Sequence, residues 1–381
     1  MKTFDKSSKL DHVAYDIRGP VLDEANRMIA KGEKILRLNT GNPAEFGFTA
    51  PDEVIRDLIM NVRNSEGYSD SKGIFSARKA IMQYCQLKGF PNVDIDDIYI
   101  GNGVSEMISM SMQALLDDGD EVLVPMPDYP LWTACVSLAG GNAVHYVCDE
   151  KSNWYPDIDD IKSKITSNTK AIVVINPNNP TGSVLDKDVL KAFIERHTEC
   201  CFVIDQSYEF FTLKPLLSAR EAAGYPNVIL LHSMTKRFAV PGLRLGFMTA
   251  NQILLREIRL QRMPWSVNQL AIEAGHYLLR HAGEYHVDIS LLLKEKDRLA
   301  EALLAIGGME VWASDTHYML VQLRMGRAAA LKEYLAGECG ILIRDASNFE
   351  GLNEHFFRIA TQTPEENNEL IESIKKWTYL Y

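Results

Sequence analysis

Seven short apolar runs, most of them rich in β-branched residues, constrain the fold of this chain more strongly than any other feature. They cover residues 98–101, 121–125, 143–147, 171–177, 201–205, 228–233 and 245–250. Strands that are apolar throughout are buried on both faces of a sheet, and the stretches between most of these runs have helical periodicity. The pattern predicts an α/β domain built on a seven-stranded, mainly parallel sheet.

After residue 285 the pattern changes to a long amphipathic helix at 288–306, followed by short strands and two further helices. This change predicts a smaller α+β domain, which we expect the N-terminal segment to complete. We therefore expect a large domain over residues 46–285 and a small domain formed by residues 1–45 and 286–381. A length of 381 residues suits two domains of this kind.

Charge and composition narrow the choice of partners. The net charge of -11 argues against nucleic acid or an anionic membrane as the main partner. Charges interrupt every apolar run well before membrane-spanning length, and the charged N-terminus lacks an apolar signal core, so we expect a cytoplasmic protein. The six cysteines show no spacing typical of a metal site, so no metal is predicted.

Lys236 is the first candidate for chemistry. It follows the apolar run that ends at Ser233, and a Pro-Gly turn and Arg244 follow it. Desolvation favours the neutral, nucleophilic form of a lysine, which is the form that reacts with an aldehyde. Ser233 and Arg244 supply a hydroxyl and a guanidinium suited to a phosphate. Taken alone, the stretch also fits a surface turn with ordinary charges.

Two further apolar runs end in polar residues. Asp205 ends the run 201–205, where an unpaired carboxylate is costly and a protonated ring nitrogen would satisfy it. Tyr208 follows three residues later. Asn179 lies in the Asn-Pro turn after the run 171–177 and is able to donate to a ligand oxygen. Each also has an ordinary interpretation, as a helix cap for Asp205 and a plain turn for Asn179.

A glycine loop precedes a helical pattern at Gly103, Val104 and Ser105, whose amides are candidates for binding an anion. Tyr129 follows another run and has a ring suited to stacking on a flat heterocycle. Arg358, in the predicted small domain, is a candidate clamp for a carboxylate. Singly, a core tyrosine and a surface arginine are the ordinary interpretations of the last two.

One ligand accounts for all of these residues together: a phosphorylated aromatic aldehyde with a ring nitrogen. In order and spacing they resemble the class I/II aminotransferases that use pyridoxal 5'-phosphate (PLP), over essentially the whole chain. The resemblance implies the fold of that family, a Schiff base between Lys236 and PLP, Asp205 at the pyridine nitrogen, and Asn179 and Tyr208 at the phenolic oxygen. It also implies a homodimer, in which Tyr68 reaches the neighbouring subunit's cofactor phosphate. The implied phosphate and ring contacts are Gly103, Val104, Ser105, Ser233, Arg244 and Tyr129.

The two halves of the chain resemble different members of that family. Residues 1 to about 182 look like bacterial alanine transaminases, through GNPAEFGF, GYSDSKG and PDYPLWTACVSL. Residues from about 183 look like threonine-phosphate decarboxylases and histidinol-phosphate aminotransferases, through SMTKRFAVPGLRLGF and IRDASNF. The first resemblance implies that Tyr15, Arg18 and Gly41 contact a small substrate. The second implies that Arg344 holds a distal substrate phosphate, although Arg344 also fits a surface charge beside Asp345.

The expected activity is amino transfer between alanine and 2-oxoglutarate, so the expected partners are amino acids and 2-oxo acids. Three alternatives stay open. They are a threonine-phosphate decarboxylase, an enzyme like histidinol-phosphate aminotransferase, and a mosaic or fused chain that binds PLP but has weak activity.

Overall fold

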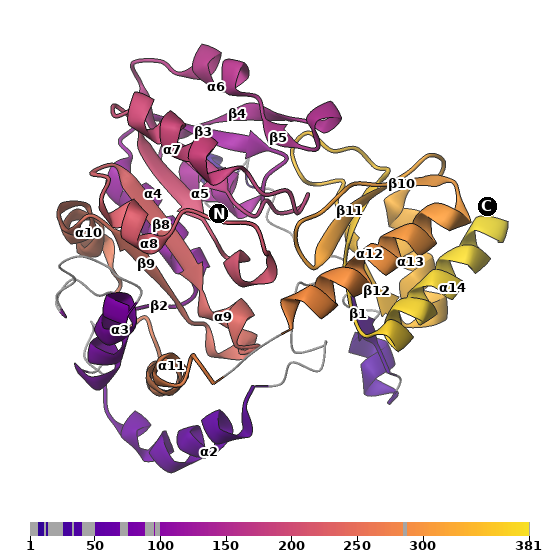
Figure 1. The fold of residues 1–381 in the computed structure, drawn as a ribbon, viewed down its shortest axis with the longest axis horizontal. Coiled ribbons are helices and arrows are strands. Elements are labelled where there is room, and N and C mark those ends of the chain that lie inside the picture. Colours follow the sequence, from indigo (N-terminus) through magenta and orange to yellow (C-terminus); the bar gives the residue numbers. More distant parts are fainter. Residues whose placement is uncertain are drawn as a thin grey trace, which may run out of the picture.

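The computed structural model describes residues 7–10, 13, 26–32, 34–39, 50–68, 75–87, 95, 100–284 and 288–380. Its largest element is a mixed, mainly parallel sheet (Figure 1) with the strand order β2-β9-β8-β7-β6-β3-β4-β5. The strands are β2 (Ile100–Gly101), β3 (Glu121–Met126), β4 (Asn142–Asp149), β5 (Tyr155–Pro156), β6 (Thr169–Ile175), β7 (Cys201–Asp205), β8 (Val228–Ser233) and β9 (Gly246–Ala250).

The predicted α/β class and the seven predicted runs are confirmed, because each run contains a strand of this sheet. The five central strands, from β8 to β4, are parallel to one another. At the edges, β9 pairs antiparallel with β8, β2 with β9, and β5 with β4. The eighth strand, β5, was not predicted. It has only two residues, too few for a detectable pattern.

Side chains of the central strands alternate between two apolar layers. In β7, Val203 packs into one layer, and its neighbours Phe202 and Ile204 pack into the other. Both faces are therefore buried, which explains why the run is apolar at every position. The first layer is covered by α4 (Val104–Leu115), α5 (Leu131–Leu138) and α10 (Gln252–Ile258). The second is covered by α6 (Ile158–Lys164), α7 (Lys187–Arg196) and α8 (Ala219–Ala223).

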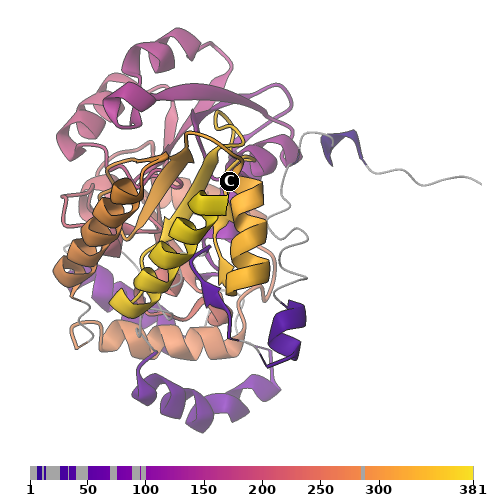
Figure 2. The same cartoon turned by 90° about the vertical axis from the view of Figure 1, so that its right-hand side faces the viewer.

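A second, four-stranded antiparallel sheet has the order β10-β11-β14-β13. Its strands are β10 (Met309–Val311), β11 (Tyr318–Leu323), β13 (Arg344–Asp345) and β14 (Phe356–Ala360). Figure 2 shows three long helices lying together beside it: α12 (Ile289–Ile306), α13 (Ala328–Cys339) and α14 (Pro364–Leu380).

The N-terminal part of the chain joins this C-terminal unit. The strand β1 (Leu36–Arg37) pairs in parallel with β12 (Ile341–Leu342). The boundaries predicted for the two domains fall within residues 40–49 and 285–287, which lie outside the described residues. The exact division therefore stays a prediction.

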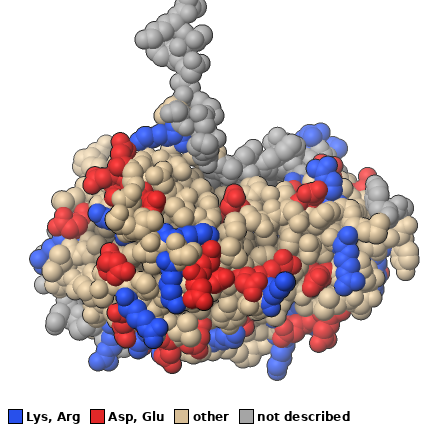
Figure 3. Space-filling model, turned by 90° about the horizontal axis from the view of Figure 1, so that it is seen from above, with Lys and Arg blue, Asp and Glu red and all other residues tan. Residues whose placement is uncertain are grey.

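The remaining elements are short or lie below the larger sheet in Figure 1. Helices α2 (Asp52–Asn61) and α3 (Phe75–Leu87) contact α11 (Gln269–Arg280). The short helices are η1 (Ser8–Leu10), η3 (Val62–Glu66), η5 (Glu150–Ser152), η6 (Glu209–Phe211), α9 (Met234–Arg237), η7 (Pro241–Leu243) and η8 (Arg259–Gln261). None of the described helices is long and apolar enough to cross a bilayer. Acidic and basic side chains are interspersed on the face shown in Figure 3.

Gly182 marks a close approach between the two sheets. Its φ of +77° belongs to the left-handed region, and a Cβ atom there would overlap the hydroxyl of Ser314. Only glycine meets both conditions.

We therefore expect Gly182→Ala to lower the free energy of unfolding by about 2–4 kcal/mol, because overpacking and a left-handed alanine both cost energy. Urea unfolding followed by circular dichroism measures this change. As a control, Gly337→Ala adds a Cβ that meets nothing within 4 Å. It lies inside helix α13, where alanine is favoured over glycine, and should not be destabilising. Equal stability of Gly182→Ala and the wild type would contradict the close approach.

Candidate functional site

The chemically distinctive residues gather at the carboxyl ends of the parallel strands. Asp205 ends β7, Ser233 ends β8, and the turn that carries Asn179 follows β6. Ligands of parallel sheets bind at this edge. A cavity of about 330 Å³ opens here and reaches across to the four-stranded sheet. Eleven of the predicted site residues line it: Val104, Ser105, Tyr129, Asn179, Asp205, Tyr208, Ser233, Lys236, Arg244, Arg344 and Arg358.

The N-terminus of α4 forms a bare backbone cradle at one end of this cavity. Gly103 is its N-cap residue, with a φ of +75°, and the Glu106 carboxylate accepts a hydrogen bond from the amide of Asn102 at 2.6 Å. A Cβ on Gly103 would lie 2.6 Å from Nη2 of Arg244. The absence of a side chain at Gly103 therefore lets this guanidinium approach the N-terminal amides of the helix, which is an arrangement suited to binding an anion. The amide of Gly103, predicted as an anion donor, instead donates to the carbonyl of Gly101 at 2.8 Å.

Among the described residues, Asp205 is the one acidic residue that lines the cavity, and it is only 6% exposed. Its Oδ1 atom accepts hydrogen bonds from the amide of Ser207 at 2.9 Å and from the Ser207 hydroxyl at 2.6 Å. Burial raises the pKa of the Asp205 carboxyl, and the bonds from Ser207 only partly offset this effect. A cationic partner in the cavity would relieve the cost of its charge.

Lys236 lies in α9, directly after β8, and is half-buried. Its Nζ atom lies 5.5 Å from the centre of the Tyr208 ring. Within the part of the chain that the structure describes, this amine forms no hydrogen bond or ion pair. The amine is therefore free to react with a ligand in the cavity.

Arg358 and Asn179 orient each other. A guanidinium nitrogen of Arg358 donates to Oδ1 of Asn179, and Nη2 donates to the carbonyl of Asn39 at 2.8 Å. Because Oδ1 is the acceptor, the NH₂ group of Asn179 is the part of its amide that can donate to a ligand. The Nε of Arg358 is buried and has no hydrogen-bond partner among the described residues, so one buried donor is left for a ligand.

Arg344 lies opposite Arg358 on the neighbouring strand. Its guanidinium donates to the carbonyl of Asp345 and to Oδ1 of Asn348, both at 2.8 Å, and lies over the ring of Phe349. Burial, with a smaller contribution from Arg358, lowers the pKa of Arg344 to about 10. Arg344 is half-buried and lines the cavity, and its role stays a prediction.

The charges around the cavity are strongly unequal. In the part of the chain that the structure describes, four basic side chains line it, from Lys236, Arg244, Arg344 and Arg358, against the single carboxylate of Asp205. The buried guanidinium of Arg358 and the half-buried guanidinium of Arg344 lie on adjacent strands and repel each other, and anions between or beside them would offset this repulsion. The cavity is thus built for a ligand, or a pair of ligands, with several negative charges.

Several residues at the site were not predicted from the sequence. Ser207 and Asn39 hold Asp205 and Arg358, and Phe349 supports Arg344. Behind Tyr129, the buried Asp128 accepts a hydrogen bond from the Thr133 hydroxyl at 3.0 Å, and burial raises its pKa to about 7. Of these residues, only Ser207 could have been recognised from the sequence, because its hydroxyl lies two residues after an aspartate that ends a strand.

Five predicted residues are not among those that line the cavity. Gly103 forms the cradle without lining the cavity. Tyr68 does not line the cavity of its own chain. It is 88% exposed, and its ring lies 5.0 Å from that of Trp265. Tyr15, Arg18 and Gly41 lie outside the described residues.

The fold and the site together define an α/β protein with a half-buried lysine amine in a cleft rich in basic side chains, and comparisons with known proteins give its family. The model of the family "Aminotransferase class I and II" matches residues 33–374. The chain therefore belongs to the class I and II aminotransferases.

Individual relatives refine this result. The chain is 54% identical to a glutamate-pyruvate aminotransferase AlaA of Haemophilus influenzae over 255 residues, which is 66% of this chain but only 63% of that protein. An aminotransferase structure from Escherichia coli superimposes with a TM-score of 0.86, 38% identity and coverage of 100% of this chain and 99% of that one. An L-threonine-O-3-phosphate decarboxylase structure from Porphyromonas gingivalis does so with a TM-score of 0.80, 28% identity and coverage of 91% and 100%.

These matches confirm both resemblances found in the sequence. The AlaA match spans 255 residues, more than the 182 expected for the alanine-type segment. The decarboxylase structure covers 91% of this chain, so its match also exceeds the predicted second half. The mosaic origin of the chain stays a prediction.

The burial of Asp205 leads to a test on the cofactor-free protein. When folding raises the pKa of a carboxyl, the folded state becomes less stable as the pH rises from about 4 through the folded-state pKa. We therefore expect Asp205→Asn, which keeps the Oδ1 acceptor, to unfold at a higher temperature than the wild type at pH 8. The difference should shrink toward about pH 4. Calorimetry at several pH values measures it, and a less stable Asn variant at pH 8 would contradict the burial argument.

Proposed function

We propose that the chain is a PLP-dependent aminotransferase that transfers an amino group between alanine and 2-oxoglutarate, with Lys236 as the catalytic lysine. The single observation that carries the proposal is the cavity, in which a free lysine amine and a buried carboxylate share one space with an anion cradle. The family match and the 54% identity to an AlaA protein support the reaction.

The residues of the cavity fit PLP group by group. The α4 amides, Ser233 and Arg244 would hold the phosphate in the cradle that a side chain on Gly103 would fill. Asp205 would face the pyridine nitrogen, and its raised pKa is what a missing cationic partner would produce. Asn179 and Tyr208 would donate to the phenolic oxygen, and Tyr129 would stack on the ring. When bound, PLP supplies an electron sink for the carbanion at the substrate's Cα atom.

The chain's own residues would then do the rest. Lys236 Nζ would bind the aldehyde covalently, yield it to the substrate's amine and move the Cα proton as general acid and base. The free Nε of Arg358 and the fork around it would hold the substrate's α-carboxylate. Tyr15, Arg18 and Gly41 would confine a small substrate. Asp205 would keep the ring nitrogen protonated throughout.

A second candidate function has an observation of its own in its favour. Arg344 supplies a second, half-buried guanidinium in the cavity, beyond the one needed for an α-carboxylate. It would suit the distal phosphate of O-phospho-L-threonine or histidinol phosphate, and a threonine-phosphate decarboxylase is among the similar structures. It would equally suit the distal carboxylate of 2-oxoglutarate, which is why amino transfer remains our first choice. A mosaic chain with weak activity is the third alternative.

We also propose a cytoplasmic homodimer that acts on small amino acids and 2-oxo acids. Large apolar side chains are exposed on the single chain around α2, α3 and residues 260–265: Ile59, Met60, Tyr68, Phe75, Met263 and Trp265. Apolar side chains exposed at this density mark an interaction surface. Tyr68, on this surface, would complete the phosphate site of the second copy.

The reaction and the lysine are tested together. We expect PLP to give the purified wild type a visible absorbance band that Lys236→Ala lacks, because the variant has no amine at this position. Pyruvate formation from alanine and 2-oxoglutarate should exceed carbon dioxide release from O-phospho-L-threonine. Lys164→Ala removes another half-buried lysine, which does not line the cavity, and is the matched control. An unchanged band in Lys236→Ala would disprove the assignment, and the reverse ranking of products would favour the decarboxylase.

The role of Arg344 is tested by selectivity. If it holds a distal anion, Arg344→Gln should weaken binding of 2-oxoglutarate or O-phospho-L-threonine about 10- to 100-fold, as expected for a charge-assisted hydrogen bond. Alanine, which has no distal anion, should keep its KM. Steady-state kinetics with each substrate measure the effect, and an equal loss for alanine would remove this role from Arg344.

A further inference from the structure

The turn between β10 and β11 contacts both chain segments that carry the proposed donors to the phenolic oxygen. Asn179 belongs to the first segment, residues 178–184, and Tyr208 begins the second, residues 208–214. These segments follow two different strands, β6 and β7, of the large sheet. The turn, residues 312–317, belongs instead to the four-stranded sheet.

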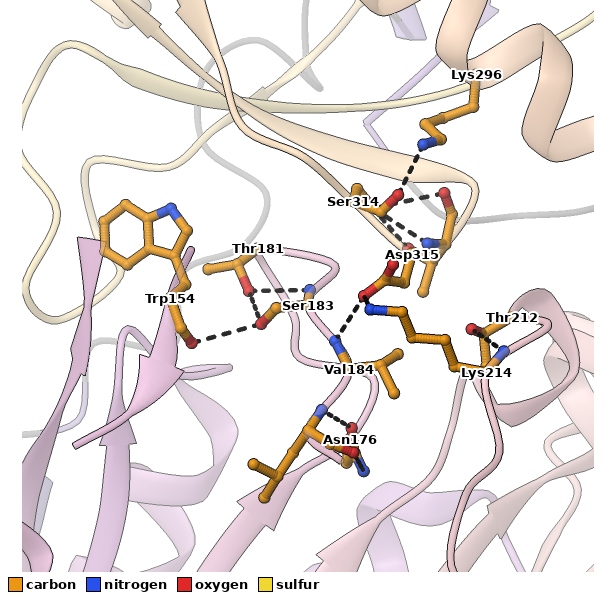
Figure 4. A network of polar contacts seen from close by, with 12 residues as sticks. Trp154, Asn176, Thr181, Ser183, Val184, Thr212, Lys214, Lys296, Ser314 and Asp315 are labelled. Atoms are coloured by element: carbon orange, nitrogen blue, oxygen red, sulfur yellow. Dashed lines mark hydrogen bonds and ion pairs between the residues drawn. The ribbon is translucent and has the colours of Figure 1, made fainter. Parts of the chain in front are cut away.

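Asp315 joins the two segments to each other. Its amide donates to the carbonyl of Gly182 at 2.9 Å, and its carboxylate accepts from the amide of Val184 at 3.1 Å. The same carboxylate oxygen lies 2.9 Å from Nζ of Lys214 (Figure 4), in an ion pair that is partly shielded from solvent. One side chain thus fixes the turn that follows Asn179 and the loop that follows Tyr208.

Tyr318, the first residue of β11, repeats this link deeper in the protein. Its hydroxyl donates to the carbonyl of Asn178 at 2.7 Å, next to Asn179. Its ring lies 4.8 Å from the ring of Tyr208, edge to face, and its side chain is fully buried. The turn itself is held by Lys296, which donates to the carbonyl of Ser314 at 2.7 Å. Asp315 and Tyr318 therefore contact the same two segments, and the turn that carries Asp315 is itself held in place by Lys296.

Neither Asp315 nor Tyr318 lines the cavity, so any influence on the chemistry passes through other residues. We propose that Asp315 and Tyr318 are positioning residues that hold Asn179 and Tyr208 against the phenolic oxygen, so that the C-terminal unit controls how tightly Lys236 Nζ keeps its proton. This inference rests on the proposed function.

The physical reason is electrostatic. Donors from Asn179 and Tyr208 withdraw negative charge from the phenolic oxygen, so this oxygen attracts the proton at Lys236 Nζ less strongly. If the donors move away, the oxygen regains that charge and the proton is held more tightly. A shift in a titration midpoint reports this effect, whereas a general loss of stability does not produce it.

The experiment uses the full chain with bound PLP and follows the pH at which its visible absorbance changes. Tyr318→Phe keeps the ring and removes only the hydrogen bond to Asn178, and Asp315→Asn removes the ion pair with Lys214. We expect each variant to raise the midpoint by about half a pH unit or more, which is about a threefold increase in proton affinity.

Tyr146→Phe is the matched control. Tyr146 is also buried, and its hydroxyl also donates to a backbone carbonyl, that of Val173 at 2.9 Å, but it does not line the cavity. It should cost similar stability in thermal unfolding of the cofactor-free protein and leave the midpoint unchanged. If Tyr318→Phe fails to fold, Asp315→Asn gives the same test, because Asp315 is only half-buried.

The outcomes separate this inference from the function on which it rests. Shifted midpoints in both variants, with none in Tyr146→Phe, support the positioning role. Unchanged midpoints, or an equal shift in the control, overturn it and leave the aminotransferase proposal intact. A wild type that gains no visible absorbance with PLP overturns the proposed function and the inference together.

Discussion

The site depends on one electrostatic imbalance: among the described residues, the cavity has one buried carboxylate and four basic side chains. Folding alone does not favour this arrangement, because Asp205 is held where its charge is poorly solvated and Arg344 and Arg358 are brought onto adjacent strands. The sheet makes it tolerable, since the carboxyl ends of parallel strands place backbone amides and side chains from distant segments around one space. A ligand with both a ring cation and several negative charges relieves each of these costs at once.

The sequence was most informative where a pattern is local. The runs that became β6, β7 and β8 are apolar at every position because both faces of the sheet are covered, and no register or pairing is needed to see this. Asp205 and Ser233 could be singled out because each ends such a run. The roles of these residues came from the family resemblance, which the structure supports by bringing them to one cavity.

What could not be predicted depends on contacts between distant parts of the chain. Asn39 reaches Arg358 across more than 300 positions, and Asp315 reaches Val184 across 131. No periodicity or motif encodes such a contact. The strand β5 could not be predicted for a different reason, because the two residues that pair with the end of β4 are too few to show a pattern. The partial burial of Arg344 likewise follows from its place opposite Arg358, which the letters IRDASNF do not reveal.

The pairing of β1 with β12 has a consequence for how the chain is made. Leu36 and Arg37 find their strand partners at Ile341 and Leu342, and the amide of Ala360 donates to the carbonyl of Leu38. During synthesis β1 must therefore wait until residue 342 has left the ribosome, whereas all strands of the large sheet, within residues 100–250, are made earlier. Contacts of such high sequence separation form slowly. Pairing of β1 with β12 is thus expected late in folding, and Asn39, which lies two residues after β1 and accepts a hydrogen bond from Arg358, takes its place with it.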